Sequence, residues 1–416
     1  MLKNPGLNLT AIAVSLFGIC CTAWAQEQPP VAVRSWDLNV DTDYAARMAK
    51  QLKIITLKSP TIVFLDNQKI AVTYEDGRGA SPSDGTILVP RVGQISPRER
   101  AESPLYKFHA LIFDVDQGPG IAKHLEWDAI REQAQLIPTH DGGFVVRVDN
   151  QFMVYSYDAQ LQNKMTLAYH GDKPLATGEE VFQEYYKAGI SNSGRSLIVC
   201  HTLRGRESGG GTQVAWYDRE TLKQIGQTSQ ATRATGCGYS LNARGDSIYI
   251  GQYTVGLHAP VWKAINPRCI KCNDPVVLDH KYERYVQLDE KHLLILEGDY
   301  QVLDLEGHEY YTIASEPGIG LAGPTPATNA PRIAYGDRQS KSERGHRWST
   351  RLYVVDWKQG REIAALKFIQ DALPAVHGGG LQLEALGVSD FAYALSPDGK
   401  KLAVLSMNSL KIYDLP

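Results

Sequence analysis

The chain has 416 residues and a formal net charge of -3 at pH 7. Apolar residues make up 43% of it and charged residues 21%, a composition typical of a folded globular protein and not of a disordered one. The length allows one large domain or two ordinary ones. The net charge excludes a globally basic nucleic-acid binder, although it leaves room for a local basic patch.

Residues 1–25 have the features of an export signal. Lys3 is the only charged residue before Glu27, an apolar run follows it, and the Ala-Trp-Ala tripeptide at 23–25 fits a cleavage site. We therefore expect a signal peptide and a mature protein that is periplasmic or secreted. A retained membrane anchor is the alternative, because the uncharged run is nearly long enough to span a bilayer. A lipoprotein is disfavoured, because isoleucine precedes Cys20 where lipidation requires a small residue.

Beyond this segment the chain repeats one pattern, a turn followed by a short apolar run. The runs begin at Ile70, Phe144, Leu197, Ile248, Leu293, Ile333 and Leu402. The shortest interval is the 40 residues between Leu293 and Ile333, and the longest is the 74 residues between Ile70 and Phe144. The shortest intervals match the period of a propeller blade, and the longest indicate insertions.

Each apolar run is followed by an alternating strand that ends on a turn-forming residue. Six of these strands end on aspartates, at Asp116, Asp158, Asp218, Asp304, Asp356 and Asp414, and the strand at 261–265 is followed by Asn266. Asp and Asn side chains accept hydrogen bonds from the backbone of the next turn. A further strand follows in most units, so the repeat predicts an all-β fold, a seven-bladed β-propeller. Two β-sandwiches are the alternative, which seven in-phase units disfavour.

The last unit is one strand short of a blade. Residues 391–416, FAYALSPDGKKLAVLSMNSLKIYDLP, contain three strands and two tight turns. Leu52–Leu57 is an apolar stretch with no blade of its own, so we expect it to pair with Leu410–Tyr413 as an N-terminal outer strand that closes the ring. The predicted organisation is a lead-in segment at 26–49 and a propeller domain at 50–416.

The sequence SPDGKKLAV, followed by KIYD, resembles the WD40/YVTN-type propeller repeat of exported bacterial propellers. The resemblance covers nearly the whole mature chain and is specific for architecture, but it says little about function. The Trp-Asp strand end and the Gly-His opening of WD40 repeats do not recur from blade to blade, so the chain is a divergent relative.

Four cysteines follow the signal segment, and in an oxidising compartment they allow three complete pairings. Cys269 and Cys272 have the spacing of half a zinc site, but no second pair of ligands accompanies them, so a local disulfide is favoured. Cys200 ends one strand and Cys237 begins the innermost strand of the next blade. We therefore expect these two cysteines to join blades three and four.

The long insertions predict which face of the propeller carries the function. We label the strands of a blade A to D from the axis outward. The B–C and D–A connections then meet at one face, the loop face, and the A–B and C–D turns meet at the other, the hairpin face. The long connections belong to the loop face and lie at Asp76–Lys107, Thr202–Thr212, Asp337–Thr350, His170–Tyr185 and Gln370–Asp390. Variable loops on a rigid scaffold are a common place for function, although neutral drift also lengthens loops.

Basic residues gather in two of these connections, whereas the D–A connections contain more acidic than basic residues. We expect contacts to a partner from His201, Arg204, Arg206, Arg338, Arg344, His346 and Arg347. Arg and His suit such contacts because they combine charge with several hydrogen-bond donors. The alternatives are charged loops that are merely solvated and, for His201, a structural histidine.

No motif of a catalytic site, phosphate-binding loop or metal site stands out. We therefore expect no cofactor, no metal ion, no nucleic-acid partner and no membrane contact after signal cleavage. The favoured function is a binding module for a protein, peptide or glycan. The alternative is an enzyme, resembling a lactonase or a quinoprotein dehydrogenase, with its site at the axial end of the ring.

Overall fold

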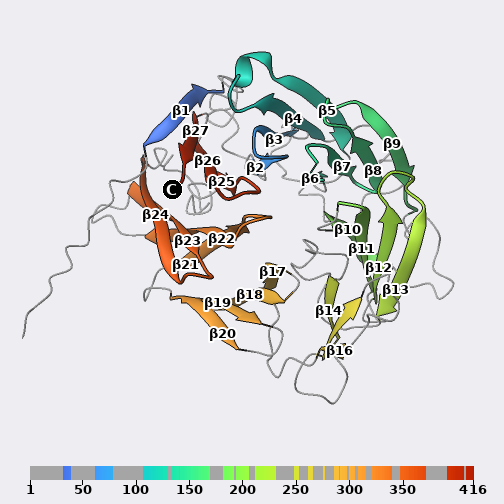
Figure 1. Ribbon diagram of the computed structural model, residues 1–416. Coiled ribbons are helices and arrows are strands. Elements are labelled where there is room, and N and C mark those ends of the chain that lie inside the picture. The colour runs from blue at the N-terminus through green and yellow to red at the C-terminus, as the bar shows by residue number, and fades with distance from the viewer. Residues whose placement is uncertain are drawn as a thin grey trace, which may run out of the picture.

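The computed structural model is a ring of antiparallel β-sheets (Figure 1). It describes residues 31–38, 61–77, 106–129, 134–139, 141–168, 181–191, 194–205, 211–230, 248–252, 261–265, 275–276, 285–289, 291–297, 299–304, 308–314, 320–339, 347–371, 391–406 and 409–416. In these ranges the one helical element is the short 3-10 turn η1 (Pro119–Ile121). They contain no helix long and apolar enough to cross a membrane. Residues 1–25, the predicted signal, lie outside them.

The strands of the described ranges form seven sheets, six with four strands and one with three. Blade 1 contains β2 (Thr61–Phe64), β3 (Lys69–Gly77), β4 (Tyr106–Asp114) and β5 (Lys123–Ala129). Blade 2 contains β6 (Ala134–Pro138), β7 (Phe144–Val148), β8 (Gln151–Tyr155) and β9 (Leu161–Thr166). Blade 3 contains β10 (Val181–Ile190), β11 (Ser196–Gly205), β12 (Gly211–Asp218) and β13 (Gln224–Gln230).

The remaining sheets continue around the ring in chain order. Blade 4 contains the three described strands β14 (Ile248–Gln252), β15 (Val261–Ile265) and β16 (Pro275–Val276). Blade 5 contains β17 (Tyr285–Gln287), β18 (His292–Glu297), β19 (Asp299–Asp304) and β20 (Glu309–Ile313). Blade 6 contains β21 (Gly320–Pro326), β22 (Arg332–Gln339), β23 (Arg347–Asp356) and β24 (Arg361–Asp371). Six blades are thus complete, and a three-stranded seventh sheet confirms the predicted β-propeller.

Blade 7 joins the two ends of the chain. It contains β25 (Phe391–Leu395), β26 (Lys401–Ser406), β27 (Ser409–Asp414) and, outermost, β1 (Ala32–Asp37). The blue and red ribbons lie side by side in Figure 1, and Trp36 is directly opposite Leu410 in the ladder. The predicted closure by an N-terminal outer strand is therefore confirmed.

The prediction that Leu52–Leu57 is the closing strand was wrong. Ala32–Asp37 occupies the place beside β27 that was assigned to Leu52–Leu57, which lies outside the described residues. The propeller therefore includes part of the segment 26–49 and begins before residue 50. The physical reason is that an outermost strand buries one face only, so alternation matters more than apolar content. Along β1, exposed Val33 and Ser35 alternate with half-buried Arg34 and Trp36.

The core lies between neighbouring blades. Among the described residues, five clusters of buried apolar side chains fill the spaces between blades 1 and 2, 2 and 3, 5 and 6, 6 and 7, and 7 and 1. Phe144 of blade 2, for example, is fully buried against blade 1 together with Phe108. Fully burying such a side chain contributes roughly 1.5–3 kcal/mol. These clusters hold the blades at fixed positions and so fix where the strand ends lie at each face.

The closing strand gives a direct test. Removing residues 1–30 leaves β1 intact, whereas removing residues 1–38 deletes β1 and the buried Leu38. We expect the longer deletion to expose the edge of β27 and to lower the free energy of unfolding by about 3 kcal/mol or more, since it removes large apolar contacts. Chemical denaturation of both variants measures the difference. Equal stability of the two would show that β1 does not close the ring.

Candidate functional site

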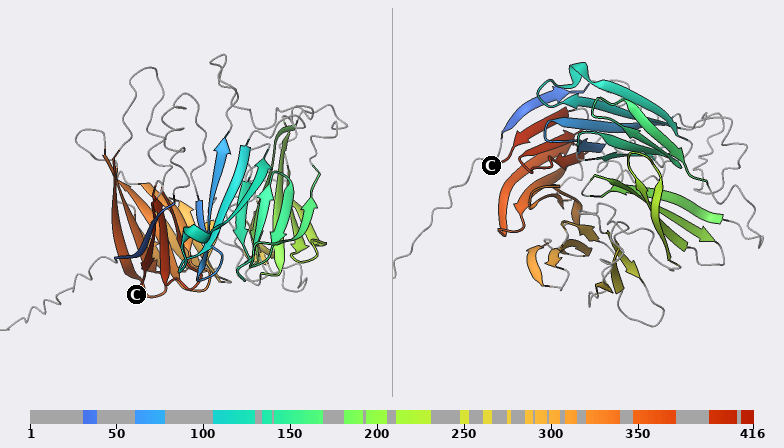
Figure 2. Two further views of the ribbon diagram at one scale, coloured as in Figure 1. Left: turned by 90° about the horizontal axis from the view of Figure 1, so that it is seen from above. Right: turned by 45° about the vertical axis from the view of Figure 1, so that its right-hand side comes forward.

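The strand bounds place the long connections at the loop face. Residues 78–105 connect β3 to β4, residues 167–180 connect β9 to β10, and residues 372–390 connect β24 to β25. The A–B hairpins are short by comparison, as between β2 and β3, where residues 65–68 form the turn. In the left view of Figure 2 the strands run between these two faces. The asymmetry expected from the sequence is therefore present in these connections. The connections predicted at Thr202–Thr212 and Asp337–Thr350 are shorter than expected, because β11 continues to Gly205 and β23 already begins at Arg347.

The hairpin face is built from turns whose aspartates accept backbone hydrogen bonds. Asp66 Oδ1 accepts from the N–H groups of Gln68, at 2.7 Å, and Lys69, at 2.6 Å. Asp398 Oδ1 accepts from the N–H group of Lys400 at 3.0 Å. Asp and Asn favour such turns for this reason. These carboxylates are thus used within their own hairpins.

Other polar groups of the hairpin face connect one blade to the next. Lys69 of blade 1 donates to the Tyr157 carbonyl of blade 2 at 2.7 Å and lies over the Tyr157 ring. Arg219 of blade 3 forms a 2.6 Å ion pair with Asp141 of blade 2. Hydrogen bonds from Thr139, Arg219 and the Gly143 N–H outweigh the effect of burial and lower the pKa of Asp141.

The same kind of contact closes the ring. Arg332 of blade 6 donates to the Gly399 carbonyl of blade 7 at 2.8 Å. The Asp398 N–H of blade 7 donates to Asn67 Oδ1 of blade 1 at 3.0 Å. Polar groups of the hairpin face therefore stabilise the seams between blades.

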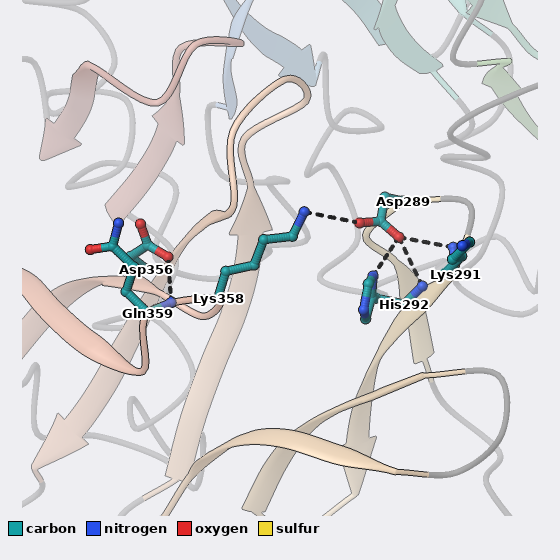
Figure 3. A network of polar contacts seen from close by, with 6 residues as sticks. All are labelled: Asp289, Lys291, His292, Asp356, Lys358 and Gln359. Atoms are coloured by element: carbon teal, nitrogen blue, oxygen red, sulfur yellow. Dashed lines mark hydrogen bonds and ion pairs between the residues drawn. The ribbon is translucent and has the colours of Figure 1, made fainter.

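Figure 3 shows such a seam between blades 5 and 6. Asp289 Oδ1 accepts from the N–H groups of Lys291 and His292 and from His292 Nδ1, at 2.8, 2.9 and 2.7 Å. Its other oxygen lies 3.8 Å from Lys358 Nζ of blade 6. Burial raises the pKa of Asp289, but these hydrogen bonds outweigh it, so the pKa is lowered overall.

The predicted contact residues fall into two separate groups. Arg204 lies near the end of β11 of blade 3, opposite Gln183. Arg338 near the end of β22 and Arg347 at the start of β23 both belong to blade 6. Blades 3 and 6 are not neighbours (Figure 1), so the fold does not bring these arginines together. Arg206, Arg344 and His346 lie outside the described residues.

His201 does not present its ring to solvent. It is 8% exposed, and its ring stacks on Tyr186 with the ring centres 4.4 Å apart. Tyr186 is its cross-strand partner, and the Tyr186 hydroxyl donates to the Ala168 carbonyl at 2.8 Å. This packing favours the structural role for His201 over contact with a partner.

Cys200 is buried and disulfide-bonded. Its partner lies outside the described residues, as do Cys237, Cys269 and Cys272. The pairing of Cys200 with Cys237, and the local disulfide between Cys269 and Cys272, therefore remain predictions.

The structure reveals a polar cluster on blade 1 that the sequence did not indicate. Tyr74 of β3, Lys107 and His109 of β4, and His124 and Glu126 of β5 share one face of the sheet. Tyr74 is opposite His109, and His109 is opposite Glu126. His109 is 6% exposed, whereas His124 and Glu126 are exposed. The signal was weak, because these residues come from three different strands and only the strand register brings them side by side.

The contacts in this blade 1 cluster are close. His109 Nδ1 lies 3.1 Å from His124 Nε2 and 3.6 Å from Glu126 Oε2. Lys107 donates to Glu126 Oε1, and this hydrogen bond is the main reason that the pKa of Glu126 is lowered. Within the described ranges, no three His, Cys, Asp or Glu side chains are arranged to hold a metal ion.

A second residue that the sequence did not indicate is Arg147, a buried cation between blades 2 and 3. It is 6% exposed, and its Nη1 donates to the Tyr186 carbonyl. Arg147 thus contacts β10, whose Tyr186 stacks on His201 of β11.

These features define the protein as a β-propeller with a structural hairpin face. The chain matches no protein-family model, and no curated protein is a detectable relative. Among solved structures it is similar to the acylaminoacyl peptidase of Pyrococcus horikoshii, at 13% identity and a TM-score of 0.48. That match covers 86% of this chain and 51% of the peptidase, so the chain spans about half of that protein.

Two further similar structures are propeller domains. The β-propeller domain of the Trilobed protease from Pyrococcus furiosus is 9% identical with a TM-score of 0.45, over 86% of this chain and 95% of that one. The Pan2 WD40 domain of Neurospora crassa is 8% identical with a TM-score of 0.43, over 93% of this chain and 96% of that one. At such identities the likeness concerns the fold alone.

The Asp289 network predicts a pH-dependent contribution to stability. Replacing Asp289 by Asn keeps the shape but weakens hydrogen bonds to a charged acceptor, so we expect a loss of about 1 kcal/mol at neutral pH. Because the pKa of Asp289 is lower in the folded than in the unfolded protein, this stability is present above about pH 4 and is lost as the pH falls through the lowered pKa.

Urea denaturation of wild type and Asp289→Asn between neutral and acid pH measures this difference. Asp414→Asn is the matched control, because Asp414 is exposed at the end of β27. A difference for Asp289→Asn that is as large in acid as at neutral pH would contradict the prediction.

The predicted disulfide is tested by mass spectrometry of a non-reduced digest. We expect a peptide pair that links Cys200 to Cys237. Replacing Cys237 by Ala should then lower the free energy of unfolding by about 2–5 kcal/mol, as loss of a native disulfide typically does. Linkage of Cys200 to Cys269 or Cys272 would show that the pairing is wrong.

Proposed function

We propose that this protein is an exported binding module that holds a protein, peptide or glycan at its loop face. The observation that carries this proposal is the unequal use of the two faces. Polar groups of the hairpin face join blades 1 to 2, 2 to 3, 5 to 6, 6 to 7 and 7 to 1. Connections as long as residues 78–105 leave the blades at the opposite face. A rigid ring with elaborated loops on one side suits recognition.

The positions of the arginines suggest how the partner is contacted. The basic connection of blade 6 lies between Arg338 and Arg347, and that of blade 3 begins beyond Arg204. Two basic arms on separate blades of one rigid ring suit a partner that is large enough to reach both. Arg is suited to this role because its planar guanidinium donates several hydrogen bonds and stacks on aromatic groups.

Export is part of the proposal and rests on the character of residues 1–25. The uncharged apolar run and the Ala-Trp-Ala tripeptide support a periplasmic or secreted location. The disulfide at Cys200 agrees with such a location, because disulfides persist in oxidising compartments.

The test is capture of partners from the native envelope fraction by wild type and by two charge-reversed variants. Arg344→Glu with Arg347→Glu reverses charge in the blade 6 connection, and Lys291→Glu with Lys400→Glu is the matched control on the hairpin face. We expect the first variant to lose partners because its association slows, and to lose more at low than at high salt. The control should capture the same partners as wild type.

Circular dichroism first establishes that both variants are folded. If the hairpin-face variant loses partners while the Arg344 and Arg347 variant retains them, the loop face is not the binding face.

A further inference from the structure

The blade 1 cluster contains two histidines that meet at their ring nitrogens. His109 of β4 is buried, and His124 of β5, the outermost strand of the blade, is exposed. His109 Nδ1 and His124 Nε2 are 3.1 Å apart, the ring centres are 5.2 Å apart, and the ring planes differ by 19°. The distance between the ring centres exceeds the distance between the nitrogens by about twice the distance from an imidazole centre to its own nitrogen. The rings therefore meet edge to edge and nearly in one plane.

This arrangement is that of a hydrogen bond and not of a metal chelate. A metal ion held between two nitrogens that point at each other needs them about 4 Å apart, twice a metal–nitrogen bond of about 2.0–2.1 Å. The observed 3.1 Å suits one hydrogen between the nitrogens. One imidazole thus donates and the other accepts.

The number of protons on the pair decides whether this contact exists. With both rings neutral, one N–H donates to the lone pair of the other ring. After uptake of one proton from solvent, the contact persists, because an imidazolium donates to the remaining neutral imidazole. After uptake of a second proton, both facing nitrogens carry hydrogen and neither accepts. Two positive charges then also face each other at the distance of a hydrogen bond.

The polar and charged groups around the His109–His124 pair come from three strands of blade 1 and from the neighbouring blade 7. Lys107 of β4 adds a positive charge, and Glu126 of β5 offers a carboxylate 3.6 Å from His109 Nδ1. Tyr74 of β3 contacts both histidines. Its hydroxyl lies 3.5 Å from His124 Nε2, and the Tyr74 ring stacks on the His109 ring with the ring centres 4.6 Å apart.

Blade 7 packs on the same side of blade 1. Its Arg34 forms a 2.6 Å ion pair with Asp116 of blade 1, so this guanidinium already has a carboxylate partner.

We propose that the His109–His124 pair is an acid-sensitive latch that holds β5 to β4 and opens when both rings are protonated. In the closed state His109 contacts His124. In the open state the exposed His124 turns into solvent, and protonated His109 takes Glu126 as its partner. His109 is the ring that keeps its place, because it is buried and stacked on Tyr74.

The latch lies at the base of the longest connection described above. Tyr74 and His109 stand three residues inside the strand ends Gly77 and Tyr106, between which residues 78–105 run. Opening the latch loosens the outer edge of blade 1 beside this connection. The latch belongs to blade 1 alone and does not depend on which partner the loop face binds.

Hydrogen exchange of β5 measures the latch. Unperturbed imidazoles titrate near pH 6.5, so the comparison is between about pH 7.5 and about pH 5, after correction for intrinsic exchange rates. In wild type we expect the β5 amides to exchange on the order of tenfold faster at the acid pH, which corresponds to about 1.4 kcal/mol of lost protection. In His124→Gln, which cannot gain this charge, the acid-specific increase should be absent.

Two further variants give the latch a signature that a merely structural contact lacks. Lys107→Met removes a positive charge and should move the opening to higher pH, whereas Glu126→Gln removes the partner of protonated His109 and should move it to lower pH. His308→Gln is the matched control, because His308 is 71% exposed on blade 5, where Asp304 is its carboxylate partner. Its exchange profile in β5 should equal that of wild type.

Ring ¹⁵N spectra of the wild-type histidines give an independent reading. We expect the His109 and His124 signals to change together and the shared hydrogen to disappear in acid. If β5 exchange does not rise in acid, the proposal is overturned. Equal acid-specific increases in wild type and His124→Gln, or shifts of the same sign in the Lys107 and Glu126 variants, would also overturn it.

Discussion

The pairing of β1 with β27 is the constraint on which the rest of the structure depends. A ring of sheets is stable when each blade buries both faces against neighbours, and the last blade can do so only if it is complete. Residues 32–37 supply its fourth strand from the other end of the chain. Trp36 packs into the core between blades 7 and 1, and Arg34 reaches Asp116 of blade 1. Three kinds of contact therefore close the ring: a backbone hydrogen-bond ladder, an apolar contact and an ion pair.

With the ring closed, its two faces serve different purposes. Apolar clusters fix the spacing of the blades, and polar contacts on the hairpin face hold the turns of neighbouring blades together. Surface ion pairs of this kind are individually weak, so their value lies in repetition around the ring. The loop face is left for connections that vary in length without disturbing the blades.

Much of the fold followed from the sequence. The alternation of apolar residues and the strand-ending aspartates are local signals, and they marked the strands and turns of the repeat. Asp218, for example, accepts from the Thr221 N–H at 3.0 Å and begins the turn that its position in the repeat predicted. The closing strand was misassigned because its pairing is not local. Nothing within AVRSWD indicates a partner almost four hundred residues away, and the more apolar Leu52–Leu57 was the stronger local candidate.

The candidate site was harder to predict for the same reason. Of the residues chosen from the sequence, Arg204 belongs to blade 3 and Arg338 and Arg347 to blade 6, which is not its neighbour, and His201 is buried against Tyr186. The blade 1 cluster depends on the register that sets His109 opposite both Tyr74 and Glu126. A histidine in an apolar strand gives no sign of what stands across from it, so only the three-dimensional structure reveals such a group.

The location of β1 also bears on how the molecule folds. Trp36 and Leu410 are 374 residues apart in the chain, so their contact is among the most distant in sequence that the protein makes. Blades 1 to 3 are built from strands that follow one another in the chain, whereas the closing ladder must await the C-terminal strands. High contact order slows folding, and an unpaired strand is open to mispairing with other chains. The half-polar character of β1, with Arg34, Ser35 and Asp37, therefore suits a strand that remains in solvent until its partner arrives.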